Sequence, residues 1–100
     1  MADRTPLTPD ERSGLADRLP EWILEGEVLR RTWAFRDFVE AWAFMGRVAE
    51  VAEDLQHHPD WSNSWNRVEM VVTTHHPVGR DGPCLTRLDV AFALAVDGLA

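Results

Sequence analysis

The sequence contains no lysine, so all ten of its basic residues are arginine. Lysine forms the Schiff bases of carbonyl and pyridoxal-phosphate enzymes, and it completes the phosphate-binding P-loop. Those classes of site are therefore excluded. With 17 acidic residues and a formal net charge of −7, the chain also offers no basic patch in sequence. We therefore expect no binding to nucleic acid.

Cysteine occurs once, as Cys84, and no apolar run approaches the length that spans a bilayer. A single cysteine cannot form a disulfide within the chain, which suits a reducing compartment. The first ten residues are polar, include two prolines and lack the apolar core of a secretory signal peptide. We therefore expect a cytoplasmic protein that does not associate with membranes.

The length of 100 residues and the hydrophobic fraction of 45% predict one domain over residues 1–100, with a core of modest size. Helix starts are indicated by capping-box patterns, in which a capping residue is followed three positions later by an acidic one. The patterns are Thr8 with Glu11, Asp37 with Glu40, and Thr86 with Asp89. They predict helices over about 9–19, 38–56 and from 87 onward.

Alternation of apolar and polar residues predicts strands over 22–24, 28–35, 61–65 and 68–74. Short turns, rather than crossover connections, separate the strands within each pair. The order of elements is therefore α-β-β-α-β-β-α. This order predicts an α+β fold with a four-stranded antiparallel sheet and three helices packed on one face.

The longest predicted helix has an apolar side with the 3.6-residue period of an amphipathic helix. That side comprises Phe38, Ala41, Trp42, Met45, Val48, Ala49, Ala52 and Leu55. Trp42, Phe44 and Met45 together make a wider apolar surface than one core face needs. We therefore predict a homo-oligomer, with a dimer favoured over a tetramer.

All four histidines occur in adjacent pairs, His57-His58 after the long helix and His75-His76 after the last strand. Two such loops that meet in space would form a pocket able to give and take protons near neutral pH. Either pair alone is more often solvated or bound to the end of a helix than catalytic. The pairing therefore identifies a candidate site without identifying its function.

Two other kinds of site are weighed against an acid–base site. Neighbouring residues of an extended segment point to opposite sides, so each histidine pair offers one good metal ligand, and there is no His-x-x-x-His motif or cysteine pair. Cys84 follows Pro83 in a loop, with no neighbouring base or cation in sequence to activate it. We therefore predict no metal site and interpret Cys84 as a small hydrophobic residue.

The run Glu53–Trp61, with the sequence EDLQHHPDW, resembles the signature of the pterin-4a-carbinolamine dehydratases. That family pattern has an acidic or polar residue, three spacers and His-His-Pro. An aromatic residue, a third histidine and an aspartate follow at set positions beyond it. This chain matches the pattern at Glu53, His57, His58, Pro59, Trp65, His75 and Asp89. The resemblance extends over about residues 10–97.

The resemblance implies dehydration of a 4a-hydroxytetrahydropterin to the quinonoid dihydropterin by histidine acid–base catalysis. It implies a hydro-lyase that needs no cofactor and no metal, and that assembles as a homodimer or homotetramer. The catalytic residues implied are His57, His58 and His75. The substrate-binding residues implied are Glu53, Pro59, Trp61, Thr74, His76 and Asp89.

The sequence departs from the family pattern at Gln56, where an acidic residue is frequent, and in the long loop from His76 to Cys84. Two non-enzymatic alternatives therefore remain. One is a dimerisation or assembly module on the same fold, and the other is a protein that binds pterins without turnover. The presence of all three expected histidines favours the enzyme. Asp89 is interpreted first as a helix cap and second as a site residue.

Overall fold

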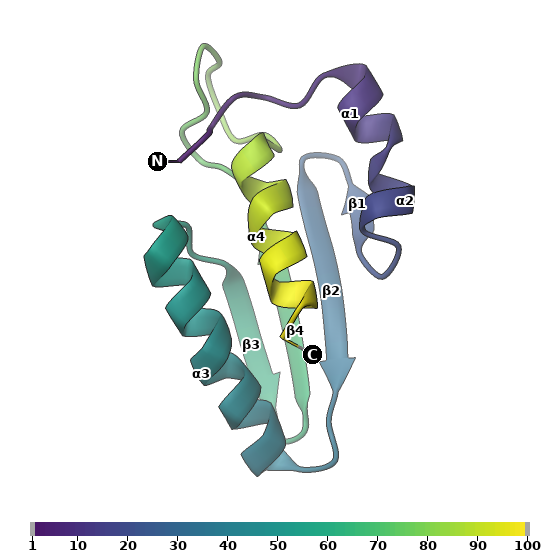
Figure 1. Ribbon diagram of the computed structural model, residues 1–100, viewed down its shortest axis with the longest axis vertical. Helices are drawn as coiled ribbons and strands as arrows, with labels where there is room; N and C mark the ends of the chain where they lie inside the picture. Colours follow the sequence, from purple (N-terminus) through teal and green to yellow (C-terminus); the bar gives the residue numbers. More distant parts are fainter. Residues whose placement is uncertain (1, 100) are drawn as a thin grey trace.

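An antiparallel sheet with the strand order β1-β2-β4-β3 forms the centre of the molecule in the computed structural model, which describes residues 2–99. Figure 1 shows α3 and α4 lying across one face of this sheet. The elements in chain order are α1 (Pro9–Ser13), α2 (Leu15–Arg18), β1 (Ile23–Glu25), β2 (Val28–Ala34), α3 (Phe38–Leu55), β3 (Asp60–Ser64), β4 (Arg67–Val72) and α4 (Arg87–Asp97). The predicted α+β architecture is confirmed.

The first predicted helix is divided into two short helices. Gly14 ends α1, and its backbone N–H donates to the carbonyl oxygens of Asp10 and Arg12. Glycine is a weak helix former, and the chain turns at this point before α2 begins. Leu15 and Leu19, beyond the break, are buried in the core. No helix among residues 2–99 is long and apolar enough to cross a membrane.

The predicted helix starts are confirmed at α1, α3 and α4, but the capping differs at α3. Thr8 with Glu11 and Thr86 with Asp89 form reciprocal capping boxes. At α3, the Asp37 side chain accepts a hydrogen bond from the Glu40 N–H at 2.9 Å. The Glu40 carboxylate instead accepts from the backbone N–H of Arg36 at 3.1 Å, so the box is only half formed.

The buried side of α3 is not the one predicted at its first turns. Ala41, Phe44, Val48 and Ala52 are buried against the sheet, whereas Phe38 and Trp42 are 45% and 63% exposed. The ring of Phe44 lies 5.0 Å from those of Trp33 and Phe35, which face it from β2 and the loop after it. This aromatic contact, which depends on the sheet, determines which side of the helix turns inward.

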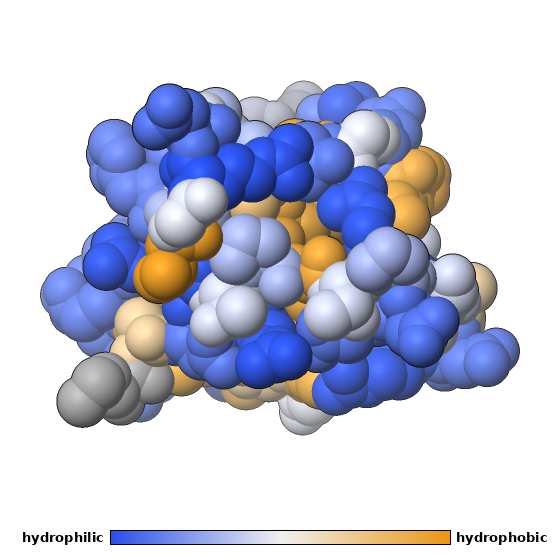
Figure 2. Space-filling view, turned by 90° about the horizontal axis from the view of Figure 1, so that it is seen from above, coloured by the Kyte–Doolittle hydropathy of each residue, from blue (hydrophilic) through white to orange (hydrophobic). Residues whose placement is uncertain are grey.

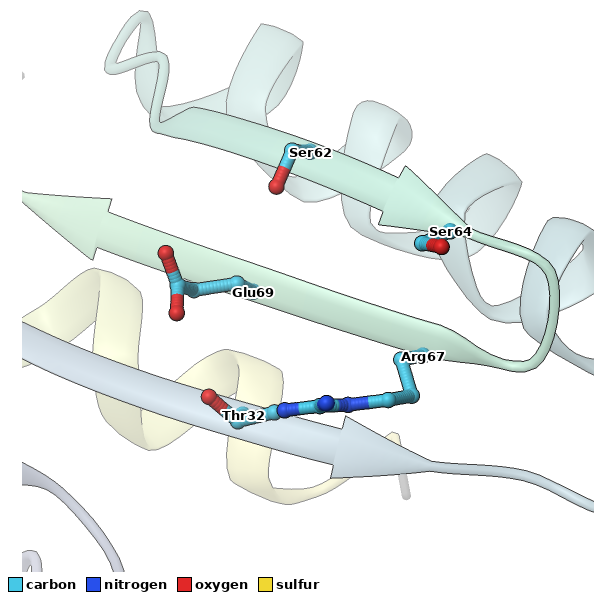
Figure 3. A pocket seen from close by; sticks show the side chains of 5 residues that line it. All are labelled: Thr32, Ser62, Ser64, Arg67 and Glu69. Atoms are coloured by element: carbon cyan, nitrogen blue, oxygen red, sulfur yellow. The ribbon is translucent and has the colours of Figure 1, made fainter.

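The face of the sheet opposite α3 and α4 is polar and uncovered among the residues described. Figure 3 shows a shallow hollow on this face, across β2, β4 and β3, with the helices behind the strands. Its lining residues are Thr32, Ser62, Ser64, Arg67 and Glu69. The hollow contains no histidine, so it lacks the side chain best suited to proton exchange at neutral pH.

Candidate functional site

The end of α3 projects the first histidine pair away from the helix. Gln56 adopts the left-handed conformation (φ 51°, ψ 46°) and closes the helix, with its backbone N–H donating to the carbonyl oxygens of Ala52 and Glu53. The N–H of His57 then bonds the carbonyl oxygen of Ala52 at 3.0 Å. A left-handed residue of this kind commonly ends a helix and redirects the chain. Pro59 follows and prevents the helix from resuming.

The two histidine pairs meet at one end of the molecule. The end of α3, the segment after β4 and the first turn of α4 come together there, as Figure 1 shows. The pocket between them is lined by Arg4, Gln56, His57, His58, Thr73, Thr74, His75, His76 and Leu88. Figure 2 views the molecule from above and shows mostly hydrophilic side chains on this face, with apolar atoms visible between them.

His57 is fixed by a buried carboxylate. Its Nε2 lies 2.6 Å from Oδ1 of Asp89, and the side chains of His57 and Asp89 are 11% and 0% exposed. The imidazole also packs edge-on against Phe92, with the ring centres 6.0 Å apart. These contacts hold the ring in one orientation at the inner wall of the pocket.

Asp89 accepts hydrogen bonds on both of its oxygens. Oδ2 accepts from the hydroxyl of Thr74 at 2.8 Å and from the backbone N–H of Thr86 at 2.8 Å. The hydroxyls of Thr74 and Thr86 lie 2.7 Å apart, so Thr86 donates to Thr74 while Thr74 donates to Asp89. An ionised Asp89 with His57 Nε2–H as donor satisfies every group in this network. Nδ1 of His57 is then the nitrogen left to exchange a proton.

His58 has a different environment. Its Nε2 lies 2.6 Å from Oε2 of Glu53, one helical turn back along α3, and both side chains are well exposed (59% and 71%). An exposed pair of this kind contributes little to stability because solvent screens it. His58 therefore lies at the solvent-exposed rim of the pocket, in contrast to the largely buried His57.

The structure brings most of the expected site residues together. His57, His58, His75, Thr74 and His76 line the same pocket. Neither Glu53 nor Asp89 is in the lining: Glu53 contacts His58 from the exposed surface of α3, and the buried Asp89 contacts His57 from the interior.

Two further expected substrate-binding residues, Pro59 and Trp61, are also absent from the lining. Pro59 is half-buried and is absent from the lining. Trp61 lies on β3 and lines an apolar hollow together with Trp42, Met45, Gly46 and Ala49 of α3. Trp65, the aromatic residue of the sequence pattern, is 66% exposed at the turn between β3 and β4.

Sequence reasoning missed four lining residues: Arg4, Gln56, Thr73 and Leu88. Gln56 and Thr73 adjoin residues already singled out, so adjacency could have found them. Leu88 lies on the inward side of the first turn of α4, next to Asp89. No sequence pattern indicated Arg4 as a lining residue, because its position depends on a contact between segments more than 70 residues apart.

The arrangement can perform proton transfer. It holds four imidazoles around one cavity, one of them oriented by a buried carboxylate, which is the geometry of a positioned general acid and base. Within residues 2–99, no three side chains of histidine, cysteine, aspartate or glutamate are grouped as a metal site requires.

Comparison with known proteins gives consistent matches over nearly the whole chain. The family model described as "Pterin 4 alpha carbinolamine dehydratase" matches residues 5–99. A Synechococcus sp. (strain WH7803) protein named "Putative pterin-4-alpha-carbinolamine dehydratase" is 48% identical over 93 residues, covering 93% of this chain and 95% of the relative. A protein of the same name from Prochlorococcus marinus (strain MIT 9303) is 51% identical, with coverages of 93% and 92%.

A similar fold is found among solved structures. The crystal structure of a transcriptional coactivator/pterin dehydratase from Brucella melitensis superposes with a TM-score of 0.81 at 34% identity, over 96% of this chain and 99% of that chain. The fold and the histidine pocket described above therefore occur in a chain that shares both sequence and topology with these proteins.

Proposed function

Because the chain belongs to the pterin-4a-carbinolamine dehydratase family, we propose that it removes water from a 4a-hydroxytetrahydropterin to give the quinonoid dihydropterin. The observation that carries the proposal is the pocket in which His57, His58 and His75 gather, with His57 oriented by Asp89. The protein would then be a hydro-lyase whose substrate is a small molecule.

The reaction requires two proton movements and no electron transfer. The bond between C4a and its hydroxyl oxygen breaks, the proton on N5 departs, and a C4a=N5 double bond forms as water leaves. An acid that protonates the leaving oxygen and a base that accepts the N5 proton balance the reaction. Positioned groups of this kind contribute typically about 10²–10⁴-fold to a rate. Histidine can take either role near neutral pH.

The different surroundings of the histidines support different roles. His57 has one nitrogen bound to a buried carboxylate, which stabilises the imidazolium that forms when the other nitrogen accepts a proton. We therefore assign His57 as the base. His58 and His75 lie on the more exposed side of the pocket, where they can exchange protons with water between turnovers. One of these two histidines is the proposed acid.

The alternative function is a non-catalytic dimerisation, assembly or pterin-binding module on the same fold. This alternative is supported by the Brucella protein described above, whose name includes both a transcriptional coactivator and a pterin dehydratase. A module without turnover has no need for a buried Asp–His pair or for three further histidines around one cavity. The enzyme is therefore the better-supported function.

The decisive test is the dehydration rate of a 4a-hydroxytetrahydropterin with and without the protein, without added metal or nucleotide. We expect a rate well above background, lost for the most part in His57→Ala and in His75→Ala. Circular dichroism should show both variants folded. A wild-type rate equal to background across several pterins would leave the binding module as the function.

We also propose that the protein is a cytoplasmic homo-oligomer, a dimer rather than a tetramer. The support for assembly is the apolar surface of α3, where Phe38, Val39 and Trp42 are 45%, 75% and 63% exposed. Beside them lies the apolar hollow shared with Trp61 of β3. Phe44, which the sequence suggested as part of this surface, is fully buried and belongs to the core. Patches of this kind commonly mark interfaces.

A further inference from the structure

Arg4 reaches the histidine pocket from the opposite end of the described chain. It is the one lining residue of the pocket that comes from the N-terminal segment before α1. It is also the one permanently charged side chain in the lining, since arginine stays protonated at any ordinary pH. The proposed reaction, which moves protons between histidines and substrate, does not use it.

The backbone around Arg4 is fixed. The carbonyl oxygen of Arg4 accepts a hydrogen bond from the N–H of Val78 at 2.9 Å, and that of Thr5 accepts from Arg87 at 3.1 Å. The N–H of Leu7 donates to the carbonyl oxygen of Leu85 at 3.1 Å. These bonds attach the N-terminal segment to the loop after β4 and to the first residue of α4, so Arg4 occupies a defined position at the pocket.

The guanidinium of Arg4 makes no ion pair or side-chain hydrogen bond within residues 2–99. The adjacent carboxylate, that of Asp3, is engaged elsewhere: Oδ1 accepts from the Thr5 N–H at 3.1 Å, and Oδ2 lies 3.8 Å from Nη1 of Arg87. The two carboxylates near the pocket are each directed at a histidine. The lining itself contains a cation and no carboxylate.

The position of Arg4 within the pocket indicates which part of a ligand it would meet. Thr74 and Leu88 are buried, and His57 is nearly so, whereas Arg4 and His76 are exposed. A ring positioned to react with His57 would lie against these buried residues. A substituent on a ring placed in this way would extend outward, toward the exposed rim that includes Arg4.

We propose that Arg4 binds a carboxylate carried by the substituent of the pterin, so that the site prefers acidic pterins to uncharged ones. This inference rests on the proposed function. The planar guanidinium matches a carboxylate in a two-point contact. A carboxylate also suits a lining with a single permanent cation, because phosphate groups carry more charge and usually recruit more than one.

The test uses two pterins that differ only in this group, pterin-6-carboxylate and 6-hydroxymethylpterin, with binding followed by pterin fluorescence. We expect wild type to bind the carboxylate about fivefold more tightly, the upper range for a solvent-exposed pair. This preference should fall with added sodium chloride. Arg4→Gln should remove the preference while leaving the affinity for 6-hydroxymethylpterin unchanged.

The matched control is Arg47→Gln, which makes the same change of charge on α3 at a residue outside the pocket lining. It should keep the wild-type preference. Equal affinities of wild type for the two pterins, or a preference that survives Arg4→Gln, would overturn the role of Arg4 while leaving dehydration intact. Absence of binding by either pterin, together with a background dehydration rate, would overturn the proposed function and this inference with it.

Discussion

At the scale of the residue, Asp89 serves the fold and the site at once. One oxygen caps α4 through the N–H of Thr86, and the other holds His57 at 2.6 Å. Its complete burial keeps water from competing for either contact. The sequence pattern predicted Asp89 first as a helix cap and second as a site residue. The geometry shows that they use different oxygens of one carboxylate, so neither excludes the other.

Asp89→Asn tests the orienting contact, since Asp89 positions His57 without lining the pocket. An amide that keeps its oxygen toward Thr86 presents an NH₂ group to Nε2 of His57, which forces the imidazole into the other tautomer. We expect kcat to fall by about 100-fold, with KM little changed. Steady-state kinetics on protein shown to be folded by circular dichroism will measure this. A variant with wild-type kcat would show that the contact is merely structural.

The residues of the site differ in how far the sequence could predict them. The histidines and Thr74 were singled out because they match a family pattern in sequence. Arg4 was missed, since no local pattern reports that its segment bonds to the chain near Val78 and Arg87. The sequence also did not show that Trp61 lies away from the histidine pocket. The side of β3 that carries the Trp61 side chain faces α3, which is a tertiary contact.

At the scale of the element, the two complete capping boxes offer a matched pair. Thr86→Ala removes the cap of α4, an 11-residue helix, and also a donor to Asp89 through the hydroxyl chain. We expect a loss of about 1–2 kcal/mol in the free energy of unfolding, together with lower activity. Thr8→Ala removes the equivalent cap from α1, which has five residues and none of them buried. Thr8→Ala should lower the free energy of unfolding by about 0.5 kcal/mol and leave activity unchanged.

Urea unfolding and the dehydration assay on the same preparations will separate the two variants. Equal losses of activity in Thr86→Ala and Thr8→Ala would show that the α4 cap has no particular link to the site.

Elements were predicted more accurately than their faces. The capping patterns and the two-residue alternation placed helices and strands within a few residues of their positions. The inward side of α3 was predicted around Phe38 and Trp42 because its first turns carry apolar residues on several sides. A period of 3.6 residues cannot choose between such sides. The choice follows from the rings of Trp33 and Phe35, which Phe44 contacts and which belong to a different element.

At the scale of the whole molecule, assembly can be tested through the exposed surface of α3. Trp42→Glu places a charge in the middle of that surface and should convert the oligomer to a monomer of 11.4 kDa by light scattering. The control, Ile23→Glu, changes a residue that is also exposed (58%) but lies on β1, at the other edge of the sheet from β3. It should leave the mass unchanged. A wild-type protein that is monomeric at tens of micromolar would contradict the assembly proposal.

Acid stability should depend on Glu27, which joins distant parts of the chain. Burial opposes ionisation of this carboxyl, but hydrogen bonds from the Leu85 N–H and the Arg12 guanidinium, with the charges of Arg12 and Arg80, outweigh it and lower its pKa. A lowered pKa in the folded state stabilises the protein above the unfolded-state pKa, near 4.3, and the contribution disappears as the pH falls through the folded-state pKa.

Glu27→Gln should therefore lower the free energy of unfolding by about 1 kcal/mol at pH 7, a value that allows for the 35% exposure of the Glu27 side chain. The difference from wild type should shrink as the pH falls below about 4. Chemical denaturation across this range measures both. Glu21→Gln, an exposed residue in no ion pair of residues 2–99, is the control and should change little. If Glu27→Gln lowered the free energy of unfolding equally at every pH, ionisation of Glu27 would not explain its contribution to stability.

The hydrogen bond between His57 and Asp89 has a kinetic consequence, because it joins residues 32 positions apart in the chain. Docking of α4 is also secured by the bond from the Trp22 indole to Asp97, across 75 positions. Contacts of such long range require distant parts of the chain to be brought together, so the pair of His57 and Asp89 cannot be complete in a local unit that forms without α4. No partly folded species that lacks docked α4 can be active. During refolding, activity should therefore return no earlier than the tertiary contacts of α4, and activity that appears before α4 has docked would contradict this.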